Sequence, residues 1–328
     1  MRSELISVSP NSEFIVVKEL TKVFPGSFVS RRRSGSALTD VSFAARRGEV
    51  IALLGENGAG KTTLLKIIAT LITPTSGTVR VMGHDAVLED NEVRSHITFT
   101  TNSERSFYYR LSGWQNLRFF SGLYGMGMKQ VRENVEPYLD ALSMRKAMSV
   151  NYMYMSTGMR RKLSFLRTLA LDRPVMLLDE PTSNMDPASS EEVSSIIRGL
   201  RNTGEKTILL STNNLEDAER LADRVFILSG GRLVFSGQPP SKALLRGTIE
   251  VVLDDDVYAD MARILPGSRR VVERDGVHFL KECKDALTEL NRTIDALRAS
   301  GVTIKSAGIV QQSLQHLFVT KTRGETRE

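Results

Sequence analysis

The chain contains the stretch Gly55-Glu56-Asn57-Gly58-Ala59-Gly60-Lys61-Thr62-Thr63, which fits the pattern G-x-x-x-x-G-K-[ST] at every fixed position. Residues 49–54 before it predict a buried strand, and residues 64–68 after it carry apolar side chains at helical spacing. Strand, glycine-rich turn and helix together predict a loop whose backbone N–H groups surround a phosphate. Lys61 is expected to reach the β- and γ-phosphates of a nucleotide, and Thr62 to bind Mg²⁺.

Length and composition limit the class of protein. The chain has 328 residues, of which 41% are hydrophobic and 25% charged, as in a globular chain with one large and one smaller domain. No run approaches the ~18 apolar residues of a membrane span, and residues 1–11 lack the apolar segment of a secretory signal. The single cysteine, Cys283, forms no internal disulfide, so a reducing cytoplasm is the expected compartment.

The formal net charge of +6 is compatible with nucleic acid, an anionic membrane face or a phosphate-rich ligand, and it does not choose among them. The densest basic cluster, Arg31-Arg32-Arg33, is followed by Ser34-Gly35-Ser36, which favours an exposed loop between two strands. A contact with lipid headgroups is the alternative. Three charges fall short of the roughly 4–8 that a polybasic membrane signal needs.

Two segments before the phosphate loop, residues 14–20 and 37–43, predict strands of a small antiparallel sheet, and residues 78–83 after it predict another strand and turn. Phe24 lies between the first two of these segments. An aromatic ring at this point either stacks on a nucleotide base or belongs to the core of the hairpin.

From Ser112 to Met148 the pattern predicts two amphipathic helices joined by an exposed connection that contains Gly122, Gly125 and Gly127. Each helix carries an apolar stripe that predicts core positions and no cofactor site. The stripes consist of Leu117, Phe119, Phe120, Leu123 and Tyr124 in the first helix and Val131, Val135, Leu139 and Leu142 in the second.

A second strong signal is an apolar run, Pro174 to Leu178, that ends in Asp179 and Glu180. Such a run predicts a buried parallel strand whose carboxyl end presents both acids beside the phosphate loop. Asp179 is placed to hold Mg²⁺, directly or through water, and Glu180 to orient and deprotonate an attacking water. A strand that simply ends in a polar turn is the alternative, which the phosphate loop upstream disfavours.

Just before that strand, Met155-Ser156-Thr157-Gly158-Met159 resembles the signature motif L-S-G-G-Q of the ATP-binding cassette (ABC) ATPases. Ser156 and Gly158 match, and the other three positions differ from the commonest residues. In that family the motif begins a helix and binds the ATP held by the other subunit of a head-to-tail dimer. Residues 183–186 are similar to the family's S-x-L-D loop at the dimer contact, which implies a nucleotide contact for Asp186.

Two positions depart from the family pattern. Residues 207–219 resemble the strand and turn that normally read S-T-H-x-x-x-E-A-E, and Asn213 replaces the histidine that contacts the γ-phosphate in the family. Asn102 replaces the glutamine that links Mg²⁺ and water to the transport subunit, with a side chain about 1.5 Å shorter. Asparagine donates a hydrogen bond but carries no proton or charge near neutral pH. We therefore hypothesise a slow or degenerate ATP site that retains the phosphate loop and the two acids.

From about Lys242 the sequence loses phosphate-site motifs and predicts a small α+β domain. Expected strands are residues 248–253, 270–273, 277–280 and 302–304. Residues 285–298 predict a helix with Leu287, Leu290, Ile294 and Leu297 on its apolar face. This segment resembles the C-terminal domain of ATPases paired with exporters of drugs, lipids and polysaccharides.

The resemblance covers residues 14–319 and implies an α/β P-loop NTPase core of the ABC ATPase type, with an antiparallel β subdomain and a helical subdomain. The expected domains are residues 1–241, with the helical subdomain at about 103–165, and residues 242–328. ATP and Mg²⁺ are the implied cofactors.

The implied protein is a peripheral ATPase on the cytoplasmic face of the cell membrane. Its partners would be separate transmembrane permease subunits and a second ABC ATPase, in a homodimer or a heterodimer, without nucleic acid. The permease is expected to dock near residues 102–124, where residues 106–109 offer aromatic anchors. Two other classes remain open: a regulatory subunit that binds ATP and hardly hydrolyses it, and a soluble translation or DNA-repair ATPase. The translation or DNA-repair class is disfavoured, because its members carry two cassettes or a long coiled coil and neither feature is found in this sequence.

Overall fold

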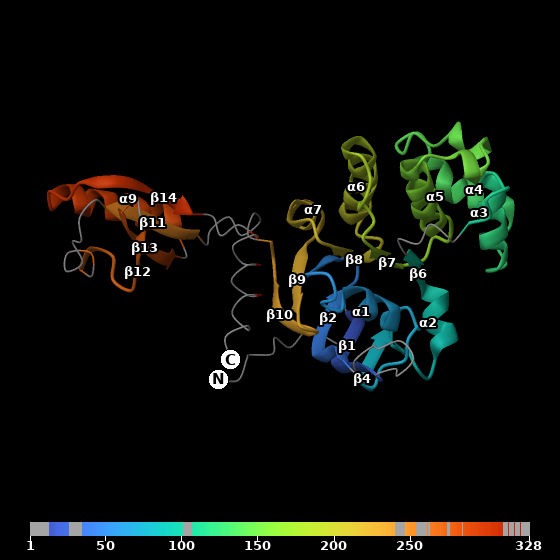
Figure 1. The fold of residues 1–328 in the computed structure, drawn as a ribbon, viewed down its shortest axis with the longest axis horizontal. Coiled ribbons are helices and arrows are strands. Elements are labelled where there is room, and N and C mark those ends of the chain that lie inside the picture. Colours follow the sequence, from blue (N-terminus) through green and yellow to red (C-terminus); the bar gives the residue numbers. More distant parts are fainter. Residues whose placement is uncertain are drawn as a thin grey trace. The chain divides into compact units, whose positions relative to one another are not determined.

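The computed structural model describes residues 13–25, 35–100, 107–239, 247–253, 261, 263–273, 276–283, 285–310, 314, 318 and 322. The chain forms two compact units that divide between Gly237 and Gln238 (Figure 1). The expected domain boundary at 241/242 lies outside the described residues, as do Asn102 and the arginines at 31–33. Within the described residues, no helix has the length and apolar character needed to cross a membrane.

A six-stranded sheet organises the first unit, with its strands in the order β10-β9-β3-β8-β7-β6. Neighbouring strands are parallel except for β10, which runs antiparallel to β9. The strands are β3 (Val50–Leu54), β6 (Ile97–Thr100), β7 (Val175–Asp179), β8 (Thr207–Thr212), β9 (Arg224–Ser229) and β10 (Arg232–Gly237). Because β3, β7 and β8 are buried along their whole length, their sequences are nearly continuous apolar runs.

Four helices accompany these strands: α1 (Lys61–Ile68), α2 (Asp90–His96), α6 (Pro187–Thr203) and α7 (Leu215–Leu221). Local sequence fixes where α6 begins and ends. Asp186 accepts a hydrogen bond from the Ser189 N–H at the start of α6, Pro187 occupies its first position, and Gly204 ends it with a φ of 66°.

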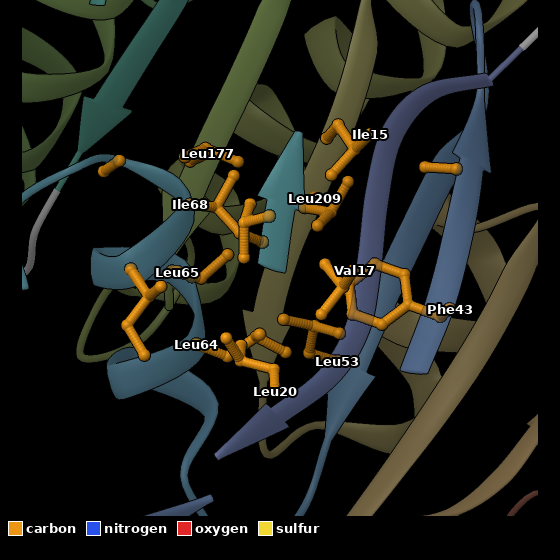
Figure 2. Packing of buried hydrophobic residues seen from close by; sticks show 14 of the residues in the cluster. Ile15, Val17, Leu20, Phe43, Leu53, Leu64, Leu65, Ile68, Leu177 and Leu209 are labelled. Atoms are coloured by element: carbon orange, nitrogen blue, oxygen red, sulfur yellow. The ribbon is translucent and has the colours of Figure 1, made fainter. Parts of the chain in front are cut away.

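The predicted antiparallel sheet is present, with its strands in the order β2-β1-β4-β5. The strands are β1 (Glu13–Phe24), β2 (Gly35–Arg46), β4 (Ser76–Val81) and β5 (His84–Asp85). The main core lies between this sheet and the six-stranded sheet, and Figure 2 shows Leu64, Leu65 and Ile68 of α1 among the side chains of both sheets. Helix α1, which starts at the phosphate loop, is therefore clamped on two sides by apolar packing.

A group of helices lies between β6 and β7 in the chain and gathers beside the sheet in Figure 1. Its members are α3 (Gly113–Gly122), α4 (Met128–Val135), the 3₁₀ turns η2 (Glu136–Tyr138), η3 (Ala147–Ser149) and η4 (Tyr152–Tyr154), and α5 (Thr157–Ala170). The second predicted helix is shorter than expected because Pro137 follows α4 in η2.

The two predicted apolar stripes differ in how far they are buried. All four residues of the second stripe are buried, as is Leu117 of the first. The prediction of a core stripe is wrong for Phe119, Leu123 and Tyr124, which are exposed by 41%, 69% and 51%. Helical spacing identifies a face but not what covers it: Tyr108 packs on Phe119, while Leu123 and Tyr124 keep more than half of their surface exposed.

The second unit contains a four-stranded antiparallel sheet in the order β12-β13-β11-β14, with helix α9 packed on it. Its elements are β11 (Gly247–Leu253), β12 (Arg269–Glu273), β13 (Gly276–Cys283), α9 (Ala286–Ala299) and β14 (Ile304–Val310). Two expectations are wrong in detail. Leu287 is 62% exposed rather than on the buried face of α9, and the last strand begins at Ile304, where the expected one ends.

Truncating the packed face of α1 should destabilise the first unit. Leu65 is fully buried, so Leu65→Ala is expected to lower the free energy of unfolding by about 2–5 kcal/mol. Leu71, which is 60% exposed, is the matched control, and Leu71→Ala should cost less than about 0.5 kcal/mol. Urea unfolding followed by circular dichroism measures both. Equal effects would contradict the role of α1 in the core.

Candidate nucleotide-binding site

The carboxyl ends of three parallel strands bring the predicted site residues to one edge of the sheet. Leu54 of β3 pairs with Thr212 of β8, and Asp179 of β7 pairs with Ser211 of β8. The residues that follow these strands are Gly55, Glu180 and Asn213. Ligands of open α/β sheets bind at this edge, so segments far apart in the sequence meet where a nucleotide is expected.

The phosphate loop requires glycine at two positions for reasons of space. A Cβ on Gly60, whose φ is 105°, would lie 2.5 Å from the Ala37 carbonyl oxygen. A Cβ on Gly55 would lie 2.5 Å from the Leu228 carbonyl oxygen. The loop is thus pressed against β2 and β9, and these contacts hold its backbone beside the start of α1.

Lys61 is buried, and its ammonium group is held by three oxygens. Nζ donates to the carbonyl oxygens of Gly55 at 2.6 Å and Glu56 at 3.1 Å, and to Asn213 Oδ1 at 2.6 Å. Burial lowers the pKa of the Lys61 ammonium group, while the carboxylates of Glu180 and Asp179 raise it. These interactions orient the cation toward the loop before any phosphate binds.

Thr62 and Asp179 form the predicted oxygen-rich pair. Thr62 Oγ1 donates to Asp179 Oδ1 at 2.9 Å and lies 3.1 Å from Oδ2. Ser211 Oγ also donates to Asp179 Oδ1, at 2.7 Å, and thereby fixes the carboxylate. A hydroxyl and a carboxylate are oxygen ligands of the kind Mg²⁺ prefers, with water in the remaining positions. The residues present therefore fit the ion.

Glu180 and Asn213 lie within hydrogen-bond distance of each other. Asn213 Nδ2 is 3.1 Å from Glu180 Oε1 and 3.0 Å from Asn57 Oδ1. Glu180 has a φ of 50°, and its N–H donates to the carbonyl oxygen and Oγ of Ser211. A non-glycine residue in the left-handed region is strained, and the bonds to Ser211 offset that strain and aim the carboxylate.

Ser211 is a site residue that sequence reasoning missed. It positions both acids and stands at the serine of the stretch compared with S-T-H, but the sequence predicted no role for it. A serine within a strand that is buried along its whole length is the signal that could have identified it, because a buried hydroxyl needs hydrogen-bond partners.

A cavity of about 750 Å³ opens beside this edge and reaches Glu180 and Asn213. It lies between the loop that follows β7 and helix α7, and Thr182 and Asp217 also line it. Thr182 Oγ1 donates to Asp217 Oδ2 at 2.8 Å, which ties that loop to α7. A water molecule has room to approach Glu180 from this side.

Ser156, Gly158 and Asp186 form a second group of predicted site residues. Among the described residues, no hydrogen bond joins this group to Lys61. Ser156 is exposed and accepts a hydrogen bond from the Met159 N–H at the start of α5, at 3.2 Å. A Cβ on Gly158 would lie 3.5 Å from Asp186 Oδ2, so the starts of α5 and α6 are adjacent. The Ser189 N–H holds the pKa of the Asp186 carboxyl below its ordinary value.

The remaining predicted site residues differ in their exposure. Phe24 is 42% exposed at the end of β1, with Lys22 Nζ 5.0 Å from its ring centroid, and it is therefore not a core residue of the hairpin. In the phosphate loop, Ala59 is buried, Glu56 and Gly58 are exposed, and Thr63 is half-buried. Asn102 lies outside the described residues, so its place relative to this edge is not described.

Known proteins resemble this chain in sequence and in fold. Residues 38–183 match the ABC transporter family. The daunorubicin resistance ATP-binding protein DrrA3 of Streptomyces coeruleorubidus is 32% identical over 89% of this chain and 92% of its own. The doxorubicin resistance ATP-binding protein DrrA of Mycobacterium tuberculosis (strain ATCC 25618 / H37Rv) is 33% identical over 88% and 89%. A solved ATP-binding subunit of an ABC transporter superposes with a TM-score of 0.60 at 28% identity, over 69% of this chain and 90% of that one. The chain belongs to the ABC transporter ATP-binding proteins, and it is an ATPase of that type.

Proposed function

We propose that this chain is the ATP-hydrolysing subunit of an ABC exporter and drives separate transmembrane subunits by ATP-dependent dimerisation. The observation that supports it most is the convergence of Lys61, Asp179, Glu180 and Asn213 at one sheet edge. The drug-resistance relatives support the direction of transport, since their names refer to resistance against daunorubicin and doxorubicin.

The arrangement supports the following roles in hydrolysis. The N–H groups of the phosphate loop and Lys61 bind the β- and γ-phosphates, and the exposed ring of Phe24 offers a surface for the base. Thr62 and Asp179 would hold Mg²⁺, which neutralises the charge that develops on the phosphate oxygens. Glu180 takes a proton from the attacking water. The oxygen of that water bonds to the γ-phosphorus, and the bond between the γ-phosphorus and the oxygen that leaves with ADP breaks.

Asn213 gives this site a neutral group where the family carries histidine. Its amide accepts a hydrogen bond from Lys61 and donates to Glu180, so it orients both but transfers no proton. The alternative function is a slow or non-hydrolysing regulatory subunit. The neutral amide of Asn213 and the presence of Asn102 in place of glutamine favour it. In a heterodimer, a competent second ATPase would then supply most of the turnover.

Dimerisation is supported by the exposed group at the start of α5. Ser156 is exposed and Gly158 lies next to Asp186, and among the described residues none of the three is hydrogen-bonded to the phosphate loop. We therefore take them to be available to a nucleotide held by another subunit. The second subunit is a copy of this chain or a related ATPase.

The docking face for the transmembrane subunit is proposed on the helices between β6 and β7. Tyr108 and Tyr109 are exposed by 50% and 49%, and Phe119, Leu123 and Tyr124 extend the apolar surface. Phe107, expected as an exposed anchor, is instead buried against Tyr152 and Phe120. Docking there would place the ATPase at the cytoplasmic face of the membrane.

Glu180→Gln tests the proposed base. The variant keeps the size of the side chain but cannot accept the proton, so steady-state Mg-ATP hydrolysis should fall by about 10²- to 10⁴-fold while ATP binding persists. Glu92→Gln, at an exposed position on α2, is the matched control and should retain the wild-type rate. Wild-type hydrolysis no faster than that of Glu180→Gln would favour the regulatory alternative.

Asn213→His tests whether the neutral amide limits turnover. We expect the hydrolysis rate to rise, by up to about 10²-fold, because the imidazole adds a group that exchanges protons near neutral pH. Asn102→Gln is added in a double variant. If neither the single nor the double variant changes the rate, neither position limits this enzyme.

Replacing Tyr108 and Tyr109 together by alanine should release the chain from native membranes. The double variant removes two exposed aromatic side chains that are expected to anchor the interface. Membrane flotation measures the bound fraction, and retained ATP binding shows that the variant is folded. Leu88→Ala, at a position 84% exposed just before α2 and outside the helices between β6 and β7, is the control and should stay bound. Full retention of the double variant would place docking elsewhere.

A further inference from the structure

The starts of α5 and α6 are packed against each other, although they come from different parts of the chain. A Cβ on Gly158 would lie 3.2 Å from Ser189 Oγ and 3.5 Å from Asp186 Oδ2. The first distance is tight for a Cβ, so a side chain at position 158 would press on α6. The residues proposed to meet the nucleotide of another subunit are therefore assembled where two helices touch.

One turn further along both helices, a lysine and a glutamate form an ion pair. Lys162 follows Gly158 by four residues in α5, and Glu192 follows Ser189 by three in α6. Residues at these spacings share a helix face, so the ion pair continues the same helix contact. Lys162 Nζ binds Glu192 Oε2, and the two side chains are only 8% and 25% exposed.

Glu192 and Lys162 each make a further contact that connects the helix starts. Ser143 Oγ, which lies between η2 and η3, donates to Glu192 Oε1 at 2.9 Å. One carboxylate thus joins α6 to two separate segments of the helices between β6 and β7. The charge of Lys162 also contributes, after the hydrogen bonds from Ser189, to holding the pKa of Asp186 below its ordinary value.

Stability alone does not explain a nearly buried ion pair at this position. Removing two charges from water costs free energy, and apolar side chains of similar size often stabilise a helix contact as well or better. Apolar surfaces also allow one helix to slide along the other, whereas an ammonium group and a carboxylate must meet at one point. The pair between Lys162 and Glu192 therefore specifies the register of α5 against α6.

We infer that Lys162 and Glu192 are positioning residues, which set the register of α5 against α6 and so hold Ser156 and Asp186 in the arrangement that receives the nucleotide of the other subunit. The inference rests on the proposed ATP-dependent dimerisation and adds two residues that act on it without touching the nucleotide. No printed contact of either residue involves the phosphate loop, so a subunit's hold on its own ATP should not depend on them.

Dimer affinity tests this role in the full chain. The register variant carries Lys162→Met with Glu192→Gln, which leaves no unpaired buried charge and keeps an acceptor for Ser143. In a Glu180→Gln background, which preserves the bound ATP, sedimentation with Mg-ATP should show a dimer dissociation constant raised at least about tenfold, since small misplacements of binding groups are costly. ATP binding by dilute, monomeric protein should be unchanged.

A matched ion pair in the second unit provides the control. Lys281 Nζ lies 2.7 Å from Glu289 Oε1, with side chains 21% and 19% exposed. The control variant, Lys281→Met with Glu289→Gln, should dimerise as its parent does, and Lys162→Arg, which keeps the pair, should retain most of the affinity. Thermal unfolding confirms that each variant is folded. Equal weakening by the register and control variants would overturn the inference.

The register itself is measurable in the isolated chain. Thr157 and Ala188 are exposed near the starts of α5 and α6, so spin labels on Thr157→Cys and Ala188→Cys, with Cys283→Ser, report the separation of the two starts. The distribution of label distances, measured by electron paramagnetic resonance, should broaden in the register variant and remain narrow in the control variant. An unchanged distribution in the register variant would refute the positioning role.

The two proposals fail in distinguishable ways. If the Glu180→Gln parent dimerises with ATP and the register variant dimerises as tightly, dimerisation stands and the positioning role is wrong. If the parent forms no dimer with ATP, dimerisation of two copies is wrong, and the label distances alone decide the register: broadening supports it and an unchanged distribution refutes it.

Discussion

The buried ammonium group of Lys61 is the constraint on which the site of the first unit depends. A buried cation must be surrounded by oxygens, and here they come from the loop after β3 and from Asn213 after β8. The helix that carries Lys61 cannot move away from this point, because Leu64 and Leu65 are held between two sheets (Figure 2). The packing of α1 thus fixes the position of the Lys61 ammonium group, and the oxygens that surround this group come from the ends of β3 and β8.

Ser211 and Asn213 connect the phosphate loop with the two acids at the end of β7. Ser211 holds both Asp179 and the backbone of Glu180, while Asn213 joins the side chains of Lys61 and Glu180. Glu180 is therefore oriented by β8 and by the residue that follows it, Asn213, which also contacts Lys61. Since the joining group is a neutral amide, it orients both side chains but transfers no proton between them.

Two kinds of surface occupy different parts of the first unit. At the sheet edge, the charged side chains of Lys61, Asp179 and Glu180 are hydrogen-bonded to neutral polar groups. The helices between β6 and β7 instead expose apolar and aromatic side chains, Leu123 and Tyr124 among them. Uncovered apolar surface raises the free energy of the isolated chain, and the transmembrane partner proposed above would lower that free energy by covering it.

The sequence alone predicted the phosphate loop, Asp179 and Glu180 at the end of β7 and several of the strands, because these depend on local patterns of glycine, charge and buried runs. It predicted no strand at β9 or β10. The assignment to the ABC ATPases came from the resemblance of its motifs to that family. Only the tertiary structure decided which contacts each side chain makes. The hydrogen bonds from Lys61 to Asn213 and from Ser211 to Asp179 join residues that are far apart in the chain. The exposure of Leu123 likewise depends on segments that are distant in the sequence. Periodicity marks an apolar face, but whether that face is covered depends on elements elsewhere, so no local pattern predicts it.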